Sequence, residues 1–415
     1  MRWSRRRVLQ LGGGFLLATG CGAAPSEEKR DRLVFWTMQL KPTFETYMAE
    51  VLAAFAESPG GTAVTWVDVP WGEMEGQILR AVAGGSPPDV VNLNPQFAAK
   101  LAAKDLLVNM GDRLPPADQQ AYFPGLWLAN RLGDRVFGLP WYIATDITIA
   151  NRELLRAAGF PQPPQTYQEL AIAAVTVRDR IGKFAFLPTM DGTQMLESMV
   201  QMGMNLLDEE GRAAFNTAKG RQAFQYWINL FQFGIVPRET LTEGHQRAIE
   251  RYQAGDLVLV MGGPQFLRQI QENAPNIAAV TEIGPQIVGE TGLRSAAVMN
   301  LVALQSSPKA EAAVALAQFL TNDANQLAFA RIANTLPSTK KAAADPFFRE
   351  EVDLLARARR VSAEQLPQAA VLVPPSDRLD ELRKILYEEL QRAMLGEKDA
   401  TRALADAASR FNQLV

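Results

Sequence analysis

Hydrophobic residues recur along this chain with two different periods. Short apolar or alternating runs at residues 33–36, 63–69 and 89–93 are typical of strands in a buried sheet. Between them, residues 44–55 and 73–83 place apolar side chains three and four positions apart, which is the spacing of one helix face. The alternation of strands and helices predicts an α/β architecture with a largely parallel sheet.

The same two periods continue to the end of the chain. Further strands are predicted at residues 135–139, 147–150, 256–261 and 299–304, and further helices at residues 98–103, 198–233, 307–319, 379–394 and 404–414. Asn151 is placed to cap a helix over residues 153–158, and Thr166 with Glu169 forms a capping box for the next helix.

Length and composition fit a large globular protein. The chain has 415 residues, a length typical of two domains. Apolar residues make up 47% and charged residues 21%, which is enough apolar material for large cores without disulfides. The formal net charge is -3, and acidic and basic residues are mixed along the chain. No long run of basic residues follows the first 21 residues, so nucleic acid is not expected as a partner. After Cys21, no segment is apolar for long enough to cross a membrane.

The first 21 residues have the features of an export signal. Arginines at positions 5–7 precede a short apolar stretch at residues 11–17, and small residues lead to Cys21. The arginines resemble a twin-arginine signal, and Cys21 stands where bacterial lipoproteins are cut and lipidated, although Ala18 replaces the usual leucine. The alternative is an ordinary cleaved signal with a chance cysteine. Residues 22–31 form a polar tether, so we expect a protein on the periplasmic or cell-surface side of the inner membrane, held there only by a lipid anchor.

The scarcity of histidine and cysteine limits the chemistry. His245 is the single histidine and Cys21 the single cysteine, so the common zinc sites, Cys-His catalysis and an internal disulfide are excluded. A Ser-His-Asp triad would depend on His245 alone. We therefore expect no metal and no cofactor. Carboxylates are plentiful, and a glycosidase-like acid pair stays open.

Aromatic and uncharged polar side chains follow the ends of several predicted strands. In open α/β sheets, ligands bind outside the carboxyl ends of the strands. A sugar offers an apolar face to an aromatic ring and hydroxyls to amide or carboxylate groups, so this mixture indicates carbohydrate binding. The candidate ligand-binding residues are Trp36, Gln39, Trp71, Asn92, Asn94, Trp141, Tyr142, Asp146, Asp191, Gly263, Phe266 and Asn300.

Structural roles compete with binding for several of these residues. Core packing explains Trp36 or Trp71 equally well, and Asp191 beside Gly192 is also a turn residue. Gly263 lies in a Gly-Gly-Pro turn between a predicted strand and helix, where a ligand could approach the backbone or the chain could simply turn. The turn lacks the Lys-Ser/Thr of a nucleotide-binding loop, so phosphate transfer is not indicated.

Several sequence fragments, in order, resemble one known family. They are Ala83-Gly84-Gly85-Ser86-Pro87-Pro88-Asp89, Gly138-Leu139-Pro140-Trp141-Tyr142, Ala150-Asn151-Arg152-Glu153-Leu154, Ala254-Gly255-Asp256 and Thr335-Leu336-Pro337. Together they are similar to bacterial extracellular solute-binding proteins of sugar ABC importers, the group that includes maltose-binding proteins. The family often has tryptophan where Phe266 stands and tyrosine where Ala150 stands.

The resemblance implies a two-lobed periplasmic-binding-protein-like fold with a hinge and a ligand cleft between the lobes. The first lobe would hold residues 32–144 and 295–331, and the second residues 145–284 and 335–415. A monomer would capture a neutral carbohydrate or sugar-like osmolyte and deliver it to the permease subunits, without catalysis. The stacking candidates are then Trp36, Trp71, Trp141, Tyr142 and Phe266, and the hydroxyl binders Gln39, Asn92, Asn94, Asp146, Asp191 and Asn300.

Two alternatives stay open. An exported polysaccharide hydrolase would place two acidic side chains opposite each other in the cleft, one of them protonated. A binder of a non-sugar solute, such as a phosphodiester, an iron chelate or a peptide, would need Arg or Lys at the cleft mouth.

Overall fold

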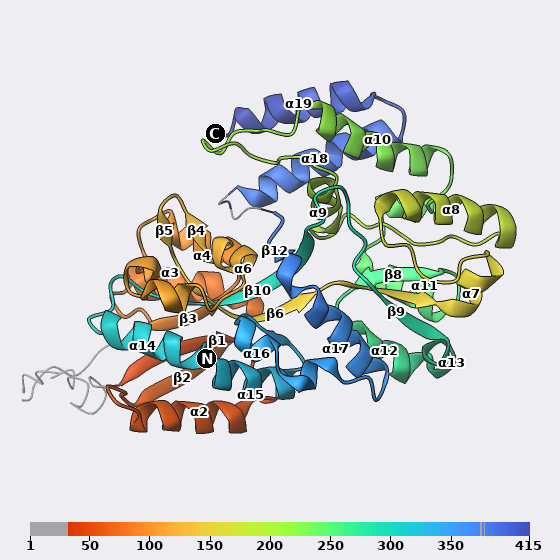
Figure 1. Ribbon diagram of the computed structural model, residues 1–415. Helices are drawn as coiled ribbons and strands as arrows, with labels where there is room; N and C mark the ends of the chain where they lie inside the picture. Colours follow the sequence, from red (N-terminus) through yellow and green to blue (C-terminus); the bar gives the residue numbers. More distant parts are fainter. Residues whose placement is uncertain (1–31, 374–375, 377) are drawn as a thin grey trace, which may run out of the picture.

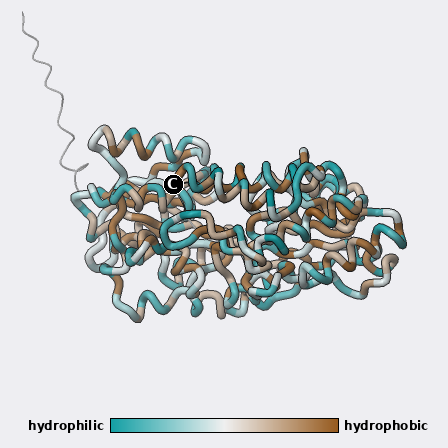
Figure 2. The backbone as a smooth tube through the Cα atoms, turned by 90° about the horizontal axis from the view of Figure 1, so that it is seen from above, coloured by the Kyte–Doolittle hydropathy of each residue, from teal (hydrophilic) through white to brown (hydrophobic). Residues whose placement is uncertain are grey.

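The protein consists of two α/β lobes that lie side by side and are joined by several chain crossings (Figure 1). The computed structural model describes residues 32–373, 376 and 378–415. The predicted export signal, Cys21 and the whole predicted tether at residues 22–31 therefore lie outside the described residues. Seen from above, the molecule is elongated along the line through the two lobes (Figure 2).

The first lobe is built on a seven-stranded mixed sheet. Its strands run in the order β11-β6-β10-β3-β1-β2, with β12 paired to β10. Their bounds are β1 Leu33–Met38, β2 Val64–Val69, β3 Val90–Leu93, β6 Leu139–Thr145, β10 Arg294–Ala303, β11 Leu336–Pro337 and β12 Ala369–Ala370. Strands β1, β2 and β3 pair parallel, and so do β10 and β12. Strand β10 returns from the other lobe antiparallel to β3 and also pairs antiparallel with β6. The prediction of a largely parallel sheet is thus corrected to a mixed one.

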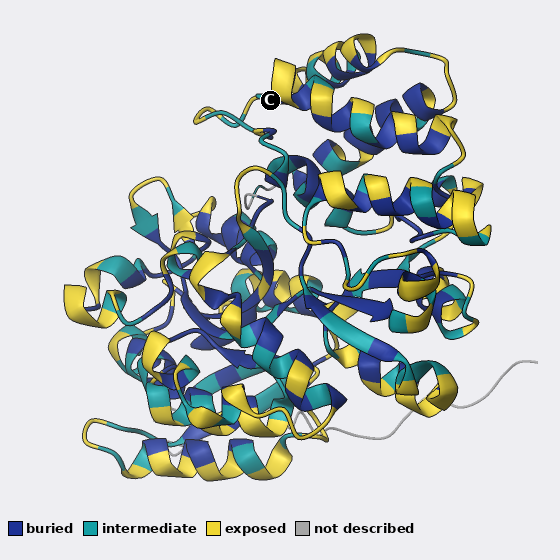
Figure 3. Ribbon diagram, turned by 45° about the vertical axis from the view of Figure 1, so that its right-hand side comes forward, coloured by how far each residue is buried: buried dark blue, intermediate teal, exposed yellow. Residues whose placement is uncertain are grey.

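Helices cover both faces of this sheet. Successive residues of β1 point to opposite faces, so Phe35 packs toward helices α2 (Glu45–Glu57) and α14 (Ala310–Leu320). Met38 packs on the other face toward α3 (Met74–Ala83) and α4 (Pro95–Ala102). The strands are therefore buried while the outer helix faces stay exposed (Figure 3).

The second lobe has a small antiparallel sheet and a larger helical layer. The sheet order is β8 (Leu259–Gly262), β7 (Ile147–Asn151) and β9 (Thr281–Pro285). The helices are α7 Arg152–Ala157, α8 Tyr167–Ile181, α9 Gln194–Gln201, α10 Ala218–Gln232, α11 His245–Gln253, α12 Gln265–Asn273, α13 Pro275–Ala279, α18 Leu379–Met394 and α19 Ala400–Asn412. One apolar core joins α8, α9 and α10 to the C-terminal pair α18 and α19.

The remaining elements are α5 Pro116–Gln119, α6 Pro124–Leu128, β4 Arg131–Leu132, β5 Arg135–Val136, α15 Asp323–Ala333, α16 Lys340–Ala343 and α17 Leu354–Glu364. Among them, α15 packs on the first-lobe sheet and the others are short or lie near the lobe crossings. Helix α17 packs its apolar face on the second lobe at Leu354, Ala358 and Val361. Within the described ranges, no helix combines the length and the apolar character that a membrane crossing requires.

Both predicted helix caps are confirmed. The side chain of Asn151 accepts hydrogen bonds from the backbone N–H groups of Glu153 and Leu154 at the start of α7. The Thr166 hydroxyl accepts from the Glu169 N–H, and the Glu169 carboxylate accepts from the Gln165 N–H. Local sequence signals thus set the starts of α7 and α8.

The predicted helix over residues 198–233 is interrupted. Helix α9 ends at Gln201 and α10 begins only at Ala218. Gly203 has φ 93°, a conformation that favours glycine and cannot continue a helix. The predicted helix at residues 307–319 begins later, at Ala310. The Ser307 hydroxyl donates to Asp89 and accepts from the Lys309 N–H just before that start.

The chain crosses between the lobes at residues close to one another in space. Asp146 alone separates β6 of the first lobe from β7 of the second, and residues 286–293 carry the chain back from β9 to β10. Strands β11 and β12 pair within the first-lobe sheet, so the predicted assignment of residues 335–415 to the second lobe is corrected at these two strands.

Candidate functional site

A cleft lies between the two lobes, with a volume of about 920 Å³ that includes space open to solvent. Its first-lobe wall is formed by Trp71, Asn94 and Gln96, and its second-lobe wall by Thr193, Gln194 and Glu197. Residues 295–299 of β10 form its floor, and residues 371–373 close one side. Both lobes therefore contribute side chains to one cavity.

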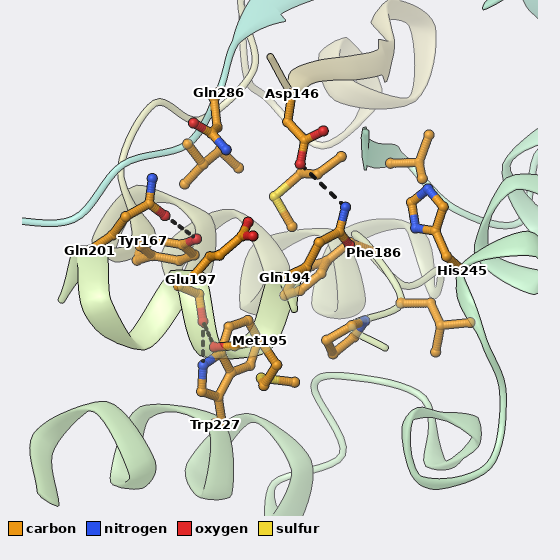
Figure 4. Close-up of a pocket in the computed structure, with 16 residues that line it drawn as sticks. Asp146, Tyr167, Phe186, Gln194, Met195, Glu197, Gln201, Trp227, His245 and Gln286 are labelled. Atoms are coloured by element: carbon orange, nitrogen blue, oxygen red, sulfur yellow. Dashed lines mark hydrogen bonds between the residues drawn. The ribbon is translucent and has the colours of Figure 1, made fainter. Parts of the chain in front are cut away.

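A second cavity continues from this cleft into the second lobe. Asp146, Gln194 and Glu197 line both spaces, so they mark the junction. The inner cavity has a volume of about 610 Å³ when the space open to solvent is included. It has a partly aromatic wall of Tyr167, Phe186 and Trp227 and also contacts His245 (Figure 4). The site is thus a cleft with a deeper aromatic pocket.

Helix α9 supplies most of the polar groups of this junction. Its apolar residues Met195, Leu196 and Met199 are buried in the second-lobe core. Gln194, Glu197 and Gln201 recur at intervals of three and four on another side of the same helix and line the inner cavity. An amphipathic helix therefore turns its polar stripe toward the ligand space.

Two carboxyl groups meet at the junction without a cationic partner. The pKa of Asp146 is raised to about 7, mainly by burial and also by the nearby Glu197, while the hydrogen bond from Gln194 opposes the rise. The Gln194 amide nitrogen lies 3.3 Å from the Asp146 carboxylate. Burial likewise raises the pKa of Glu197, while hydrogen bonds to Ser295 and Thr193 oppose it. Neither acid forms an ion pair within the described chain.

His245 begins helix α11 at the edge of the inner cavity. Its backbone N–H donates to Asp191 at 2.8 Å, and its ring lies 4.9 Å from the Phe266 ring. Burial lowers the pKa of His245, and the charge of Asp191 only partly offsets this. The imidazole is therefore neutral at pH 7 and adds no positive charge to the cavity.

Three of the residues predicted from the sequence line the cleft: Trp71, Asn94 and Asp146. The Trp71 indole is 48% exposed, so its ring face is available to a ligand. Asn94 also caps α4 by accepting from the Phe97 N–H. Asp191 and Phe266 contact His245, so they lie behind the part of the inner-cavity wall that His245 forms.

The structure corrects the prediction for Asn92, Trp141 and Asn300. All three are 0% exposed, so no ligand in the cleft can reach them in this conformation. Trp141 stacks on Phe329 at 5.0 Å within the first-lobe core, because β6 is covered on both faces. Asn92 donates to the Asn300 carbonyl between neighbouring strands.

The remaining four predicted residues do not contribute to either cavity wall. Trp36 and Tyr142 are half-buried against the first-lobe core. Gln39 is exposed at a turn, with φ 55°. Gly263 is buried between β8 and α12. The predicted strand ends thus lie at the edge of the sheet that borders the cleft, but strand position alone does not predict the orientation of each side chain.

Several lining residues in α4, in α9 or directly before α9 were not among the predicted binding residues. Among them are Gln96, Thr193, Gln194, Glu197 and Gln201. The three-and-four spacing of the polar residues in α9 was the one local signal that could have indicated them.

Among the described residues, no group of three or more His, Cys, Asp or Glu side chains is arranged to hold a metal ion. The described walls of the cleft and of the inner cavity also contain neither Lys nor Arg. The arrangement can therefore stack a ring, accept hydrogen bonds and attract positive charge.

Comparison with known proteins identifies the family. Residues 39–327 match the family model of the bacterial extracellular solute-binding proteins. This chain belongs to that family. The two-lobed fold expected from the resemblance is confirmed. The relatives and structural neighbours are binding proteins rather than enzymes.

Solved structures and a named relative agree with this assignment. A candidate oligosaccharide periplasmic-binding protein of Synechococcus sp. MITs9220 is 40% identical, with a TM-score of 0.81 and coverage of 92% of this chain and 98% of that one. It was also solved in complex with zinc. The sugar-binding protein MalE of Xanthomonas citri is 24% identical, with a TM-score of 0.79 and coverage of 92% and 96%. A candidate ABC transporter-binding protein of Deinococcus radiodurans is 24% identical over 237 residues, which are 53% of this chain and 55% of that protein.

Proposed function

We propose that this protein captures a carbohydrate or sugar-like osmolyte outside the inner membrane and delivers it to the permease subunits of an ABC importer. One observation carries the proposal: an exposed indole and uncharged polar groups from both lobes face one cleft. Trp71 covers a sugar face, and Asn94, Gln96 and Gln194 exchange hydrogen bonds with hydroxyls. Asp146 and Glu197 accept further hydrogen bonds at the junction.

The proposed capture is reversible and uses lobe closure about the hinge. A dissociation constant of roughly micromolar, about -8 kcal/mol, suits a protein that must both bind and release its ligand. The proposal includes export by the twin-arginine signal and anchoring through a lipid on Cys21. Mass spectrometry of the mature N-terminus tests that part directly.

Isothermal titration calorimetry with a panel of mono- and oligosaccharides and polyols tests the ligand class. Binding of one class with Trp71-dependent affinity supports the proposal. Absence of binding by every member at millimolar concentration contradicts it.

A hydrolase remains the second candidate because the acid pair Asp146 and Glu197 is buried and has raised pKa values. The two acids come from the hinge crossing and from α9, rather than from opposite lobes. Turnover of chromogenic glycosides by the purified protein, abolished by Glu197→Gln, would favour this candidate over pure binding.

A further inference from the structure

The acid pair at the junction of the cleft and the inner cavity lacks a positive counterpart. Its hydrogen-bond partners are the neutral groups Gln194, Thr193 and Ser295. The described walls of both cavities contain no Lys or Arg, and His245 is neutral. Two carboxylates in such surroundings repel each other and lose hydration, so a cation between them would relieve both costs.

The other walls of the inner cavity suit an organic cation. The rings of Tyr167, Phe186 and Trp227 line the space beside Glu197 (Figure 4). Aromatic faces attract ammonium groups, and the attraction is stronger where water is excluded. Because the described residues offer no metal-binding group of three ligands, this space favours an ammonium over a bare metal ion.

We propose that the carbohydrate captured by this cleft carries a protonated amine, which binds between the carboxylates of Asp146 and Glu197. The sugar ring lies against Trp71, and the ammonium points toward the inner cavity. The inference rests on the proposed function and refines it, since it replaces the neutral ligand expected from the sequence with one that is positively charged at a single position.

Matched pairs of ligands measure the effect of one positive charge on binding affinity. Maltitol and sorbitol are compared by calorimetry with their 1-amino-1-deoxy counterparts, which differ only in one ammonium for one hydroxyl. At pH 7.5 we expect the amine of the better-fitting pair to bind at least tenfold more tightly. Equal or weaker binding of the amine would overturn the inference.

Variants test whether the two carboxylates are responsible. Asp146→Asn and Glu197→Gln should each reduce the amine preference, which is the ratio of the amine and neutral affinities within one variant, to less than threefold. Glu153→Gln is the matched control, because it removes an equal charge from an exposed position on α7. An amine preference that survives the Asp146→Asn/Glu197→Gln double variant would also overturn the inference.

The pH dependence gives an independent measurement. An alkylamine stays protonated from pH 5.5 to 8. The groups that face the pair are Tyr167 from α8, His245 from α11 and Tyr387 from α18. Burial raises the pKa of both tyrosines, so they are neutral throughout this range, and it lowers the pKa of the histidine below its ordinary value, so that ring is mainly neutral from pH 7 upward. Amine binding should therefore tighten severalfold with rising pH as the carboxyls ionise, and a flat profile would count against the proposal.

The outcomes separate this inference from the proposed function. If neutral and amine ligands bind equally, the amine inference fails and carbohydrate capture stands. If neither ligand binds, and no member of the wider sugar panel binds, the proposed function fails. The last experiment is titration with Zn²⁺ alone. If zinc binding requires both acids and no amine preference is found, the amine inference is overturned and the site binds a metal ion instead.

Discussion

At the scale of single residues, Trp71 is the ring most accessible to a ligand. We expect Trp71→Ala to weaken ligand binding about tenfold, because loss of ring stacking costs about 1–1.5 kcal/mol. The side chain is half exposed, so the free energy of unfolding should change little. Calorimetry and urea unfolding measure the two effects. Phe233→Ala, which removes a 75% exposed ring from the end of α10, is the control.

Asp146 should make the stability of the free protein depend on pH. Burial raises the pKa of this carboxyl to about 7, well above the value in the unfolded chain. Its contribution is therefore fully present below about pH 4 and is lost as the pH rises through about 7. Asp146→Asn should become progressively more stable than the wild type over that range, as measured by urea unfolding. A difference that does not vary with pH would contradict the assignment.

At the scale of elements, the C-terminal helices are held by a buried ion cluster. Glu389 of α18 is 1% exposed in its side chain and pairs with Lys398, Arg392 and Arg410. Burial alone would raise the pKa of Glu389, but the hydrogen bonds from Lys398 and Arg410 outweigh it and lower the pKa. The cluster therefore stabilises the packing of α18 against α19.

We expect Glu389→Gln to lower the free energy of unfolding by about 2–4 kcal/mol, because it leaves the buried Lys398 ammonium and two half-exposed guanidinium groups without their shared carboxylate. Since the folded-state pKa is lowered, the contribution is present above the ordinary glutamate pKa and disappears as the pH falls through the folded-state value. Denaturant unfolding at pH 7 and at low pH measures both effects. Glu388→Gln, in the half-exposed pair with Arg410, should cost less than about 1 kcal/mol.

Local signals predicted elements much better than they predicted the site. The side chains of Asn151 and Thr166 accept hydrogen bonds from backbone N–H groups two or three residues away. Such caps can therefore be inferred from the residues that are adjacent in the sequence. Which face of a strand meets a ligand depends on what packs on it from distant segments. Trp141 was predicted to follow the end of a strand, but β6 continues to Thr145 and Phe329 from α15 covers the Trp141 ring. Trp71, on a short turn, stays uncovered.

At the scale of the whole molecule, the side chain of one glutamine forms hydrogen bonds with both segments that cross between the lobes. The Gln365 amide donates to the Asp146 carbonyl at 3.1 Å and to the Thr145 hydroxyl at 3.4 Å. Its side-chain oxygen accepts from the Gln286 N–H and from Arg294. Gln365 thus contacts the crossing from β6 to β7 and the return to β10, which are the segments that must bend when the lobes close.

We expect Gln365→Ala to widen the range of lobe orientations in the free protein. The variant leaves the buried Gln286 N–H without its partner, which costs about 1–3 kcal/mol of stability. Because a looser hinge must be ordered on binding, ligand affinity should fall about fivefold. Small-angle X-ray scattering should then show a larger radius of gyration without ligand and the wild-type value at saturation. Gln368→Ala, an exposed glutamine next to the same crossing, should change neither quantity. An unchanged affinity and scattering profile in Gln365→Ala would show that the crossings bend independently of this side chain.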